Sequence, residues 1–133
     1  MADEKKDLKE SKLFTPYKLN EHITLRNRTI RSAAFESMGK DFGPTQKLKD
    51  YHVSVAKGGV GMTTLAYASI NRSGVSFNSQ LWLRDEIIEP LKDITDAIHA
   101  EGAAAGIQIG HCGNMTHWST AGSFPVSASN GFN

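Results

Sequence analysis

The sequence predicts an α/β fold in which parallel strands alternate with helices. Three segments with strand character, residues 28–35, 60–68 and 103–110, are separated by two segments with helical periodicity. This order implies parallel strands joined by right-handed crossovers, in an open doubly wound sheet or in part of a barrel. A (β/α)8 barrel needs eight strand–helix units and about 250 residues. The 133 residues therefore hold only the first few units of such a barrel, which would be incomplete.

Charge and composition argue against several classes of function. The net charge is +1 with scattered Lys and Arg, so there is no electrostatic footprint for nucleic acid. No apolar run approaches the roughly 18 to 20 residues that span a bilayer, and the first residues lack a secretory signal. The single Cys112 cannot form an internal disulfide, which fits a reducing compartment. We expect a cytoplasmic protein that binds neither nucleic acid nor membrane.

The N-terminal region divides into a tail and the start of the folded part. Residues 1–12 carry mixed charges and few apolar side chains, which predicts a disordered, solvated tail. The folded domain would then comprise residues 13–133. Its first elements are two short extended pieces, 17–19 and 23–25, which we expect to form a small hairpin.

The first βα unit follows this hairpin. Its strand, residues 28–35, ends in small residues, which weaken the strand and let a ligand approach the backbone closely. Thr45 is a good N-cap for the next helix, and Gly58 ends it. The residues of this helix that recur at helical spacing are Leu48, Tyr51, His52 and Val55.

The second strand and second helix are separated by a long polar loop, residues 69–84, of the kind that often carries function. Pro90 marks the first turn of the helix, and Gly102 ends it before the third strand. Its apolar face comprises Leu91, Ile94, Ala97 and Ile98. The glycines of 58–61 lie between a helix and the next strand, the wrong end for a dinucleotide-binding loop, so we expect a tight turn there.

In parallel α/β proteins the ligand lies at the carboxyl ends of the strands. This rule selects residues 32–35, 66–68 and 108–111, two of them dominated by small side chains and the third containing Gln108. Exposed backbone and one carboxamide, which donates and accepts at once, suit a flat ring such as an isoalloxazine. Without further evidence, however, Gln108 is more simply an ordinary polar residue at a strand end.

Several motifs, in order, resemble the old yellow enzyme family of flavin oxidoreductases, and the chain is similar to the flavin domain of bacterial 2,4-dienoyl-CoA reductases. The resemblance covers residues 13–113. Its motifs are LFTP at 13–16, LRNR at 25–28, GGVG at 58–61, HAEG at 99–102 and IQIGHCG at 107–113.

The resemblance implies a (β/α)8 barrel that holds FMN, takes hydride from NADH or NADPH, and reduces an activated C=C bond or another small-molecule acceptor. The implied cofactor-binding residues are Ser32, Ala33, Ala34 and Phe35 on the first strand, Ala66 and Tyr67 on the second, and Gln108 on the third. The catalytic acid pair and the phosphate site of the family would lie beyond Asn133, so no catalytic residue is assigned.

The chain departs from the family pattern at three places. The family often has a Pro where this chain has Ala33. Phe35 lies where the family has a Thr or Cys nearby that bonds the flavin and tunes its potential, and Asn114 replaces an Arg. Glu36 follows the flavin segment and is as well explained by a solvated loop charge as by a ligand contact.

Two other interpretations remain. A metal site at His111, Cys112 and His117 falls short of a zinc signature, because no fourth ligand has the standard spacing, so we expect no metal. The chain could instead be a non-catalytic fragment that is inert or needs a partner to supply the missing strands. Three parallel strands leave unpaired edges, which favour self-association.

Overall fold

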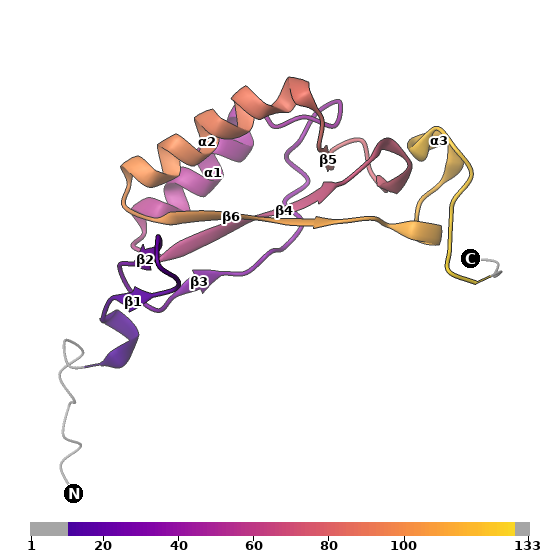
Figure 1. Cartoon of the computed structure of the whole chain (residues 1–133). Coiled ribbons are helices and arrows are strands. Elements are labelled where there is room, and N and C mark those ends of the chain that lie inside the picture. Colours follow the sequence, from indigo (N-terminus) through magenta and orange to yellow (C-terminus); the bar gives the residue numbers. More distant parts are fainter. Residues whose placement is uncertain (1–10, 130–133) are drawn as a thin grey trace, which may run out of the picture.

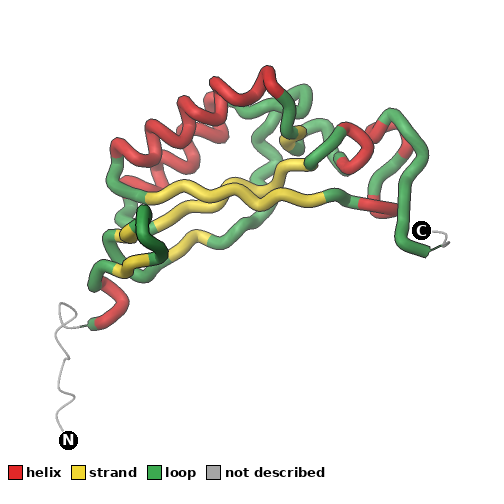
Figure 2. The backbone as a smooth tube through the Cα atoms, viewed as in Figure 1, coloured by secondary structure: helices red, strands yellow, loops and turns green. Residues whose placement is uncertain are grey.

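The computed structural model describes residues 11–129, in which two helices cover one face of a parallel sheet (Figure 1). These helices, α1 (Gln46–Lys57) and α2 (Ile88–Ala100), pack side by side on that face. Within the described residues no helix covers the opposite face, as the tube in Figure 2 shows. Most of the predicted tail, residues 1–10, lies outside the described residues.

The sheet is built around one central strand. β4 (Met62–Ser69) pairs in parallel with β3 (Ile30–Arg31) at Met62 and Thr63, and with β6 (Ala104–Gly110) along its whole length. A short strand in the predicted loop, β5 (Leu81–Trp82), pairs in parallel with the last two residues of β4. The predicted parallel arrangement is confirmed, whereas the pattern of the long loop gave no signal for β5.

The first strand is much shorter than predicted. We expected residues 28–35, but β3 ends at Arg31, and residues 32–35 form no strand. β6 occupies one edge of β4, so β3 and β5 share the other edge, at its start and its end respectively. Between them, side chains instead of a strand contact the backbone of β4. The alanines, which have weak strand propensity, lie in this unpaired segment.

The N-terminal elements lie at the amino end of the strands. A 3-10 turn at Lys12–Phe14 precedes β1 (Tyr17–Lys18) and β2 (Thr24–Leu25). The turn starts at Lys12 with Ser11 as its N-cap, so these two residues of the predicted disordered tail are ordered. These two strands pair antiparallel at the predicted place. The Asn20 side chain accepts hydrogen bonds from the N–H groups of His22 and Ile23 at 2.9 and 2.8 Å, which closes the turn.

Both helices begin and end close to the predicted places. Thr45 Oγ1 accepts a hydrogen bond from the N–H of Leu48, and α1 ends before Gly58. α2 begins at Ile88, two residues before Pro90, which lies in the first turn, where no N–H is needed. The helices, β4 and β5 enclose one apolar core of Leu48, Ala56, Leu65, Ala68, Leu81, Ile94, Ile98 and Ala103.

The loops after β4 and β6 pack against each other beyond the sheet. Ile70 N–H donates to Gly110 O at 3.1 Å, and Cys112 N–H donates to Gly74 O at 3.0 Å. The short helix α3 (Trp118–Ala121) follows, at the opposite end from the hairpin. In the described part of the chain, none of the helices has the length and apolar character needed to cross a lipid bilayer.

Candidate functional site

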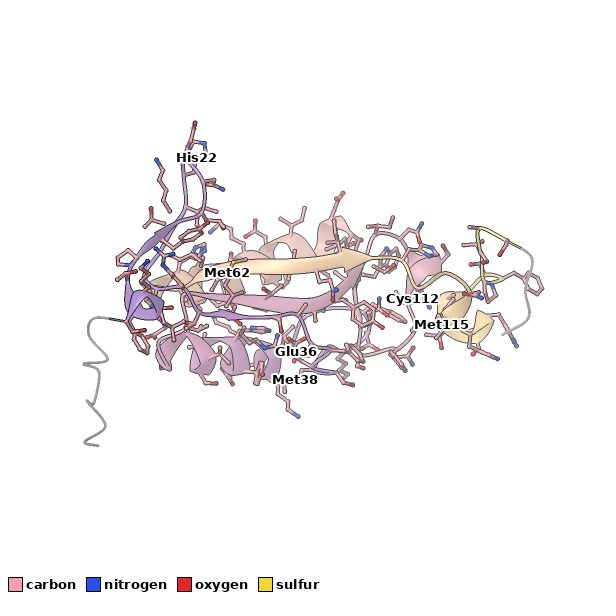
Figure 3. The ribbon with its side chains drawn as sticks, turned by 90° about the horizontal axis from the view of Figure 1, so that it is seen from below. His22, Glu36, Met38, Met62, Cys112 and Met115 are labelled. Carbon is pink, nitrogen blue, oxygen red and sulfur yellow. The ribbon has the colours of Figure 1, made fainter. Side chains whose placement is uncertain are left out.

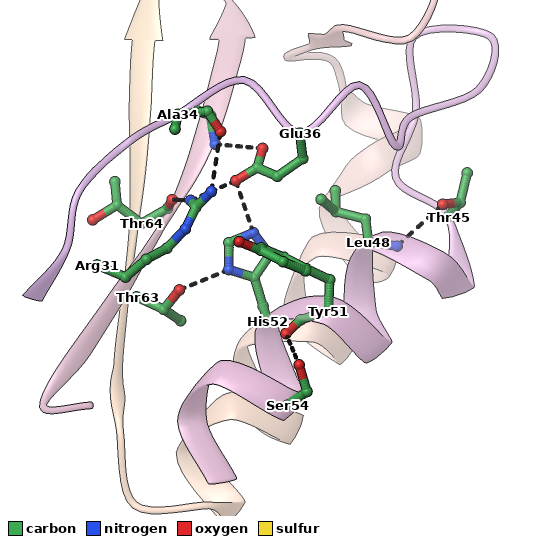
Figure 4. Close-up of polar contacts among 11 residues, drawn as sticks. Arg31, Ala34, Glu36, Thr45, Leu48, Tyr51, His52, Ser54, Thr63 and Thr64 are labelled. Carbon is green, nitrogen blue, oxygen red and sulfur yellow. Dashed lines mark hydrogen bonds and ion pairs between the residues drawn. The ribbon is translucent and has the colours of Figure 1, made fainter. Parts of the chain in front are cut away.

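The segment after β3 lies beside the carboxyl half of β4. Arg31 Nη2 donates to Ala34 O at 3.1 Å (Figure 4). Glu36 Oε2 accepts a hydrogen bond from the N–H of Ala66 at 3.1 Å. These two contacts span the place where β3 has stopped pairing with β4. The first two predicted segments, residues 32–35 and 66–67, are therefore neighbours.

The third predicted segment meets them through the register of β6. Leu65 of β4 pairs with Ile107, and the next pair is Ala68 with Ile109, so Ala66 and Tyr67 together lie opposite one residue, Gln108. This irregularity is a β-bulge, a feature that often redirects side chains beside a site; the Ala66–Tyr67 peptide bond is cis. All seven predicted site residues thus gather at one end of the sheet.

Gln108 projects from the face that no described helix covers. Side chains alternate along a strand, and Ala105 packs against the core under the helices. Gly106, Gln108 and Gly110 therefore share the other face, where a Cβ on Gly106 would lie 2.4 Å from Met62 Cε. Seen from this side in Figure 3, Met62 lies toward the hairpin end and Cys112 toward the other.

The exposure of the predicted residues fits a surface that a flat ring can contact. Gln108 is exposed, and its carboxamide makes no hydrogen bond to any residue of 11–129. Ser32 and Ala34 are exposed, Ala33 is half-buried, and Ala66 is buried. Small side chains and a carboxamide without a partner are the donor set and the shape that the pyrimidine edge of a flavin needs. The residues present fit this group.

Aromatic side chains border the same region. The Phe35 ring lies 5.1 Å from the Tyr67 ring, edge to face, and 5.2 Å from the Phe77 ring, nearly parallel. Phe77 belongs to the long loop, whose polar composition gave no reason to single it out. Phe35 has an aromatic environment here in place of a hydrogen-bonding one.

Glu36 is not the solvated loop charge that the sequence allowed. Its side chain is 2% exposed, and its Oε1 lies 2.5 Å from Arg31 Nη1 and 3.2 Å from His52 Nε2. His52 is fully buried on α1, and its Nδ1 lies 2.8 Å from Thr63 Oγ1. Glu36 escaped prediction because its partners come from three separate elements; the only signal was a carboxylate directly after the small-residue segment.

The electrostatics of Glu36 follow from these contacts. Burial raises the pKa of its carboxyl group, but hydrogen bonds from His52, from its own backbone and from Ala66, with the charge of Arg31, lower it. The lowering contributions prevail, and the pKa of Glu36 lies below its ordinary value. The carboxylate is therefore charged at neutral pH although it is enclosed.

A second group of polar side chains, Tyr67, Gln80 and Cys112, lies where the loop after β4 meets the loop after β6. The Tyr67 hydroxyl is 3.8 Å from Cys112 Sγ, which is 3.9 Å from Gln80 Oε1. Burial, followed by the hydrogen bond and charge of Cys112, raises the pKa of Tyr67, against a smaller lowering by Ser76. Cys112 is half-buried here, and among residues 11–129 no three His, Cys, Asp or Glu side chains are placed to share a metal ion.

Comparison with known proteins points to one family. The sequence model of the "NADH:flavin oxidoreductase / NADH oxidase family" matches residues 12–130. The chain is 41% identical over 118 residues to a probable N-methylproline demethylase of Rhizobium meliloti, covering 87% of the chain and 17% of that protein. It is 39% identical over 101 residues to a 4,4'-dithiodibutanoate disulfide reductase of Rhodococcus erythropolis, covering 76% and 25%.

Two solved structures are similar to this chain in fold. An old yellow enzyme homologue from Zymomonas mobilis is 23% identical with a TM-score of 0.80, covering 90% of this chain and 33% of that one. A 2-naphthoyl-CoA reductase is 25% identical with a TM-score of 0.77, covering 84% and 17%. The chain therefore spans only 17% to 33% of the length of these four proteins.

Proposed function

Because the chain belongs to the NADH:flavin oxidoreductase / NADH oxidase family, we propose that it forms the first βα units of a (β/α)8 barrel that binds FMN. The whole barrel would take hydride from NADH or NADPH and reduce an activated alkene or another small-molecule acceptor. This membership confirms the resemblance drawn from the motifs. The observation that carries the proposal is the convergence of Gln108 with the small residues that follow β3 and with Ala66 in the carboxyl half of β4.

Each predicted residue has a role in this proposal. Gln108 binds the pyrimidine edge of the ring, since its free carboxamide donates and accepts. Ser32, Ala33, Ala34 and Ala66 let the ring approach the backbone, and Phe35 and Tyr67 border it. FMN, when bound, supplies the hydride transfer, and the protein supplies orientation and polar contacts. None of the seven residues is assigned a proton transfer.

The experiment is a titration of the chain with FMN, followed by quenching of flavin fluorescence. We expect binding, and we expect Gln108→Ala to weaken it about tenfold, equivalent to about 1.4 kcal/mol, because the contacts to the ring edge are lost. Gln46→Ala is the matched control, since this exposed glutamine lies on α1 and bonds only Asp50. Failure of the chain to bind FMN, or equal affinity of the Gln108 and Gln46 variants, would overturn the proposal.

One observation favours a second candidate, a non-catalytic chain that depends on a partner for further strands. Within the described residues β6 pairs only with β4, and Ile107 and Ile109 beside its open edge are 37% and 58% exposed. An open edge next to apolar side chains favours association, including self-association. Light scattering after size exclusion distinguishes the two: a monomer that binds FMN and oxidises NADPH excludes this candidate. We propose the cytoplasm as the compartment for either function, because the single Cys112 has no disulfide partner.

A further inference from the structure

We infer that Glu36 is a positioning residue for the proposed flavin site, acting with Arg31 and His52 to hold the unpaired segment after β3 against β4. This inference rests on the proposed function. Figure 4 shows the three side chains between β4 and α1. None of the three belongs to the residues assigned to contact the ring.

The network replaces part of the missing β-ladder. The register of β3 on β4 ends at Arg31 opposite Thr63, so the following backbone groups of β4 have no strand beside them on this edge. Arg31 Nη1 donates to Thr64 O at 2.6 Å, and Glu36 Oε2 accepts from Ala66 N–H at 3.1 Å. Two side chains thus satisfy groups that a longer first strand would have paired.

This replacement leaves the backbone of the unpaired segment available. Within residues 11–129 the N–H groups of Ala33 and Phe35 make no hydrogen bond, whereas a regular ladder would use such groups. Arg31 Nη2 meanwhile donates to Ala34 O at 3.1 Å, and because Nη1 of the same guanidinium donates to Thr64 O, Arg31 links the segment to β4. The segment is therefore both held in place and open to a ligand.

Glu36 is the point on which the network depends. Its two oxygens contact Arg31, His52 and the Ala66 N–H, and it is enclosed, so losing one partner leaves a buried charge short of compensation. His52 is fixed in turn by Thr63, which joins the network to α1 and the core. The Tyr51 ring, 5.2 Å from the Arg31 guanidinium, covers its other side.

Glu36→Gln is the sharpest perturbation, because it keeps the shape of the side chain. The carboxylate accepts from Arg31 with one oxygen and from the Ala66 N–H with the other, so the NH2 group of a glutamine must face one of these two donors. We expect the segment to loosen, FMN to bind about tenfold more weakly, and the absorption spectrum of bound flavin to change at saturation. Glu86→Gln is the matched control, since its side chain is 76% exposed and lies 3.5 Å from Arg84.

The experiment has a flavin-free arm and a flavin arm on the full chain. Amide exchange measured by NMR reports on Ala66, expected to be protected in the wild type and to exchange at least about tenfold faster in Glu36→Gln. Fluorescence quenching and the visible spectrum report on FMN. If Glu36→Gln does not fold, Arg31→Lys serves instead, since a lysine keeps the charge but cannot reach Thr64 O and Ala34 O together.

The outcomes separate the two claims. Unchanged exchange of Ala66 in a folded variant overturns the inference whatever FMN does. Faster exchange with unchanged FMN affinity and spectrum also overturns it, because the network would then be only structural. If the wild-type chain does not bind FMN, the proposed function is overturned, and so is the claim that the Glu36 network positions the FMN site. Faster exchange, weaker binding and an altered spectrum in Glu36→Gln, with a normal Glu86→Gln, support the inference.

Discussion

Two arginines, one before β3 and one at its carboxyl end, show how differently the two ends of this strand are held. At the amino end, Arg26 donates to Val60 O at 3.0 Å, to Glu101 O at 2.8 Å and to Ala56 O, which joins the hairpin to the ends of both helices. Toward the carboxyl end, Arg31 donates to two carbonyls and to the buried carboxylate of Glu36. The amino end is closed by backbone acceptors, whereas the carboxyl end depends on a titratable group and leaves backbone open.

The difference indicates a division of roles. Backbone carbonyls do not titrate, so the contacts of Arg26 persist at any pH at which the protein folds. The contacts that the Glu36 carboxylate accepts depend on its protonation, and they lie beside the residues proposed to bind FMN. This separation matches the general rule that stability resides at the amino ends of barrel strands and chemistry at the carboxyl ends.

The largest effect is expected at the amino end. Arg26→Ala removes three hydrogen bonds from a charged donor and should lower the free energy of unfolding by about 3 kcal/mol. Urea denaturation measures it, with Arg28→Ala as the control, because that guanidinium only covers the Tyr17 ring and bonds Thr15. If the division of roles holds, folded Arg26→Ala keeps the FMN affinity of the wild type; a large loss of affinity would contradict it.

The next effect concerns acid stability. The pKa of Glu36 is below its ordinary value of 4.5, so its stabilising contribution is complete above that pH and is lost as the pH falls through the lowered pKa. Urea midpoints measured from neutral pH down into the acid range should therefore converge for the wild type and Glu36→Gln. Glu86→Gln should follow the wild type throughout. A gap that stayed constant to low pH would show that Glu36 is not the titrating group.

The smallest effect is expected on the open face beside Gln108. Gly106→Ala places a methyl group against Met62 Cε, the flexible end of that side chain. The free energy of unfolding should therefore change by less than about 1 kcal/mol. The methyl group nevertheless thickens the surface that would face the ring, and FMN affinity should fall more than stability does. Thermal unfolding and flavin quenching on the same samples test this; a large loss of stability would mean that Met62 cannot move.

The comparison also shows which parts of the site were open to prediction. The small residues after the first strand, the Ala66 position and Gln108 follow from strand order and motifs, and the structure brings them together. Their contacts with a cofactor stay a prediction. The early end of β3 and the burial of Glu36 were not predicted, because the contact that encloses Glu36 against β4 is to Ala66, 30 residues away in sequence.

The sequence by itself determined the helices and the parallel order of the strands, because caps, glycines and apolar spacing act within a few residues. Only the tertiary structure decided that β3 stops at Arg31 and that a buried carboxylate completes the edge of β4. The physical reason is the cost of enclosing a charge. Glu36 can be buried only where a guanidinium, an imidazole and a backbone N–H from separate elements converge, and no local pattern encodes that convergence.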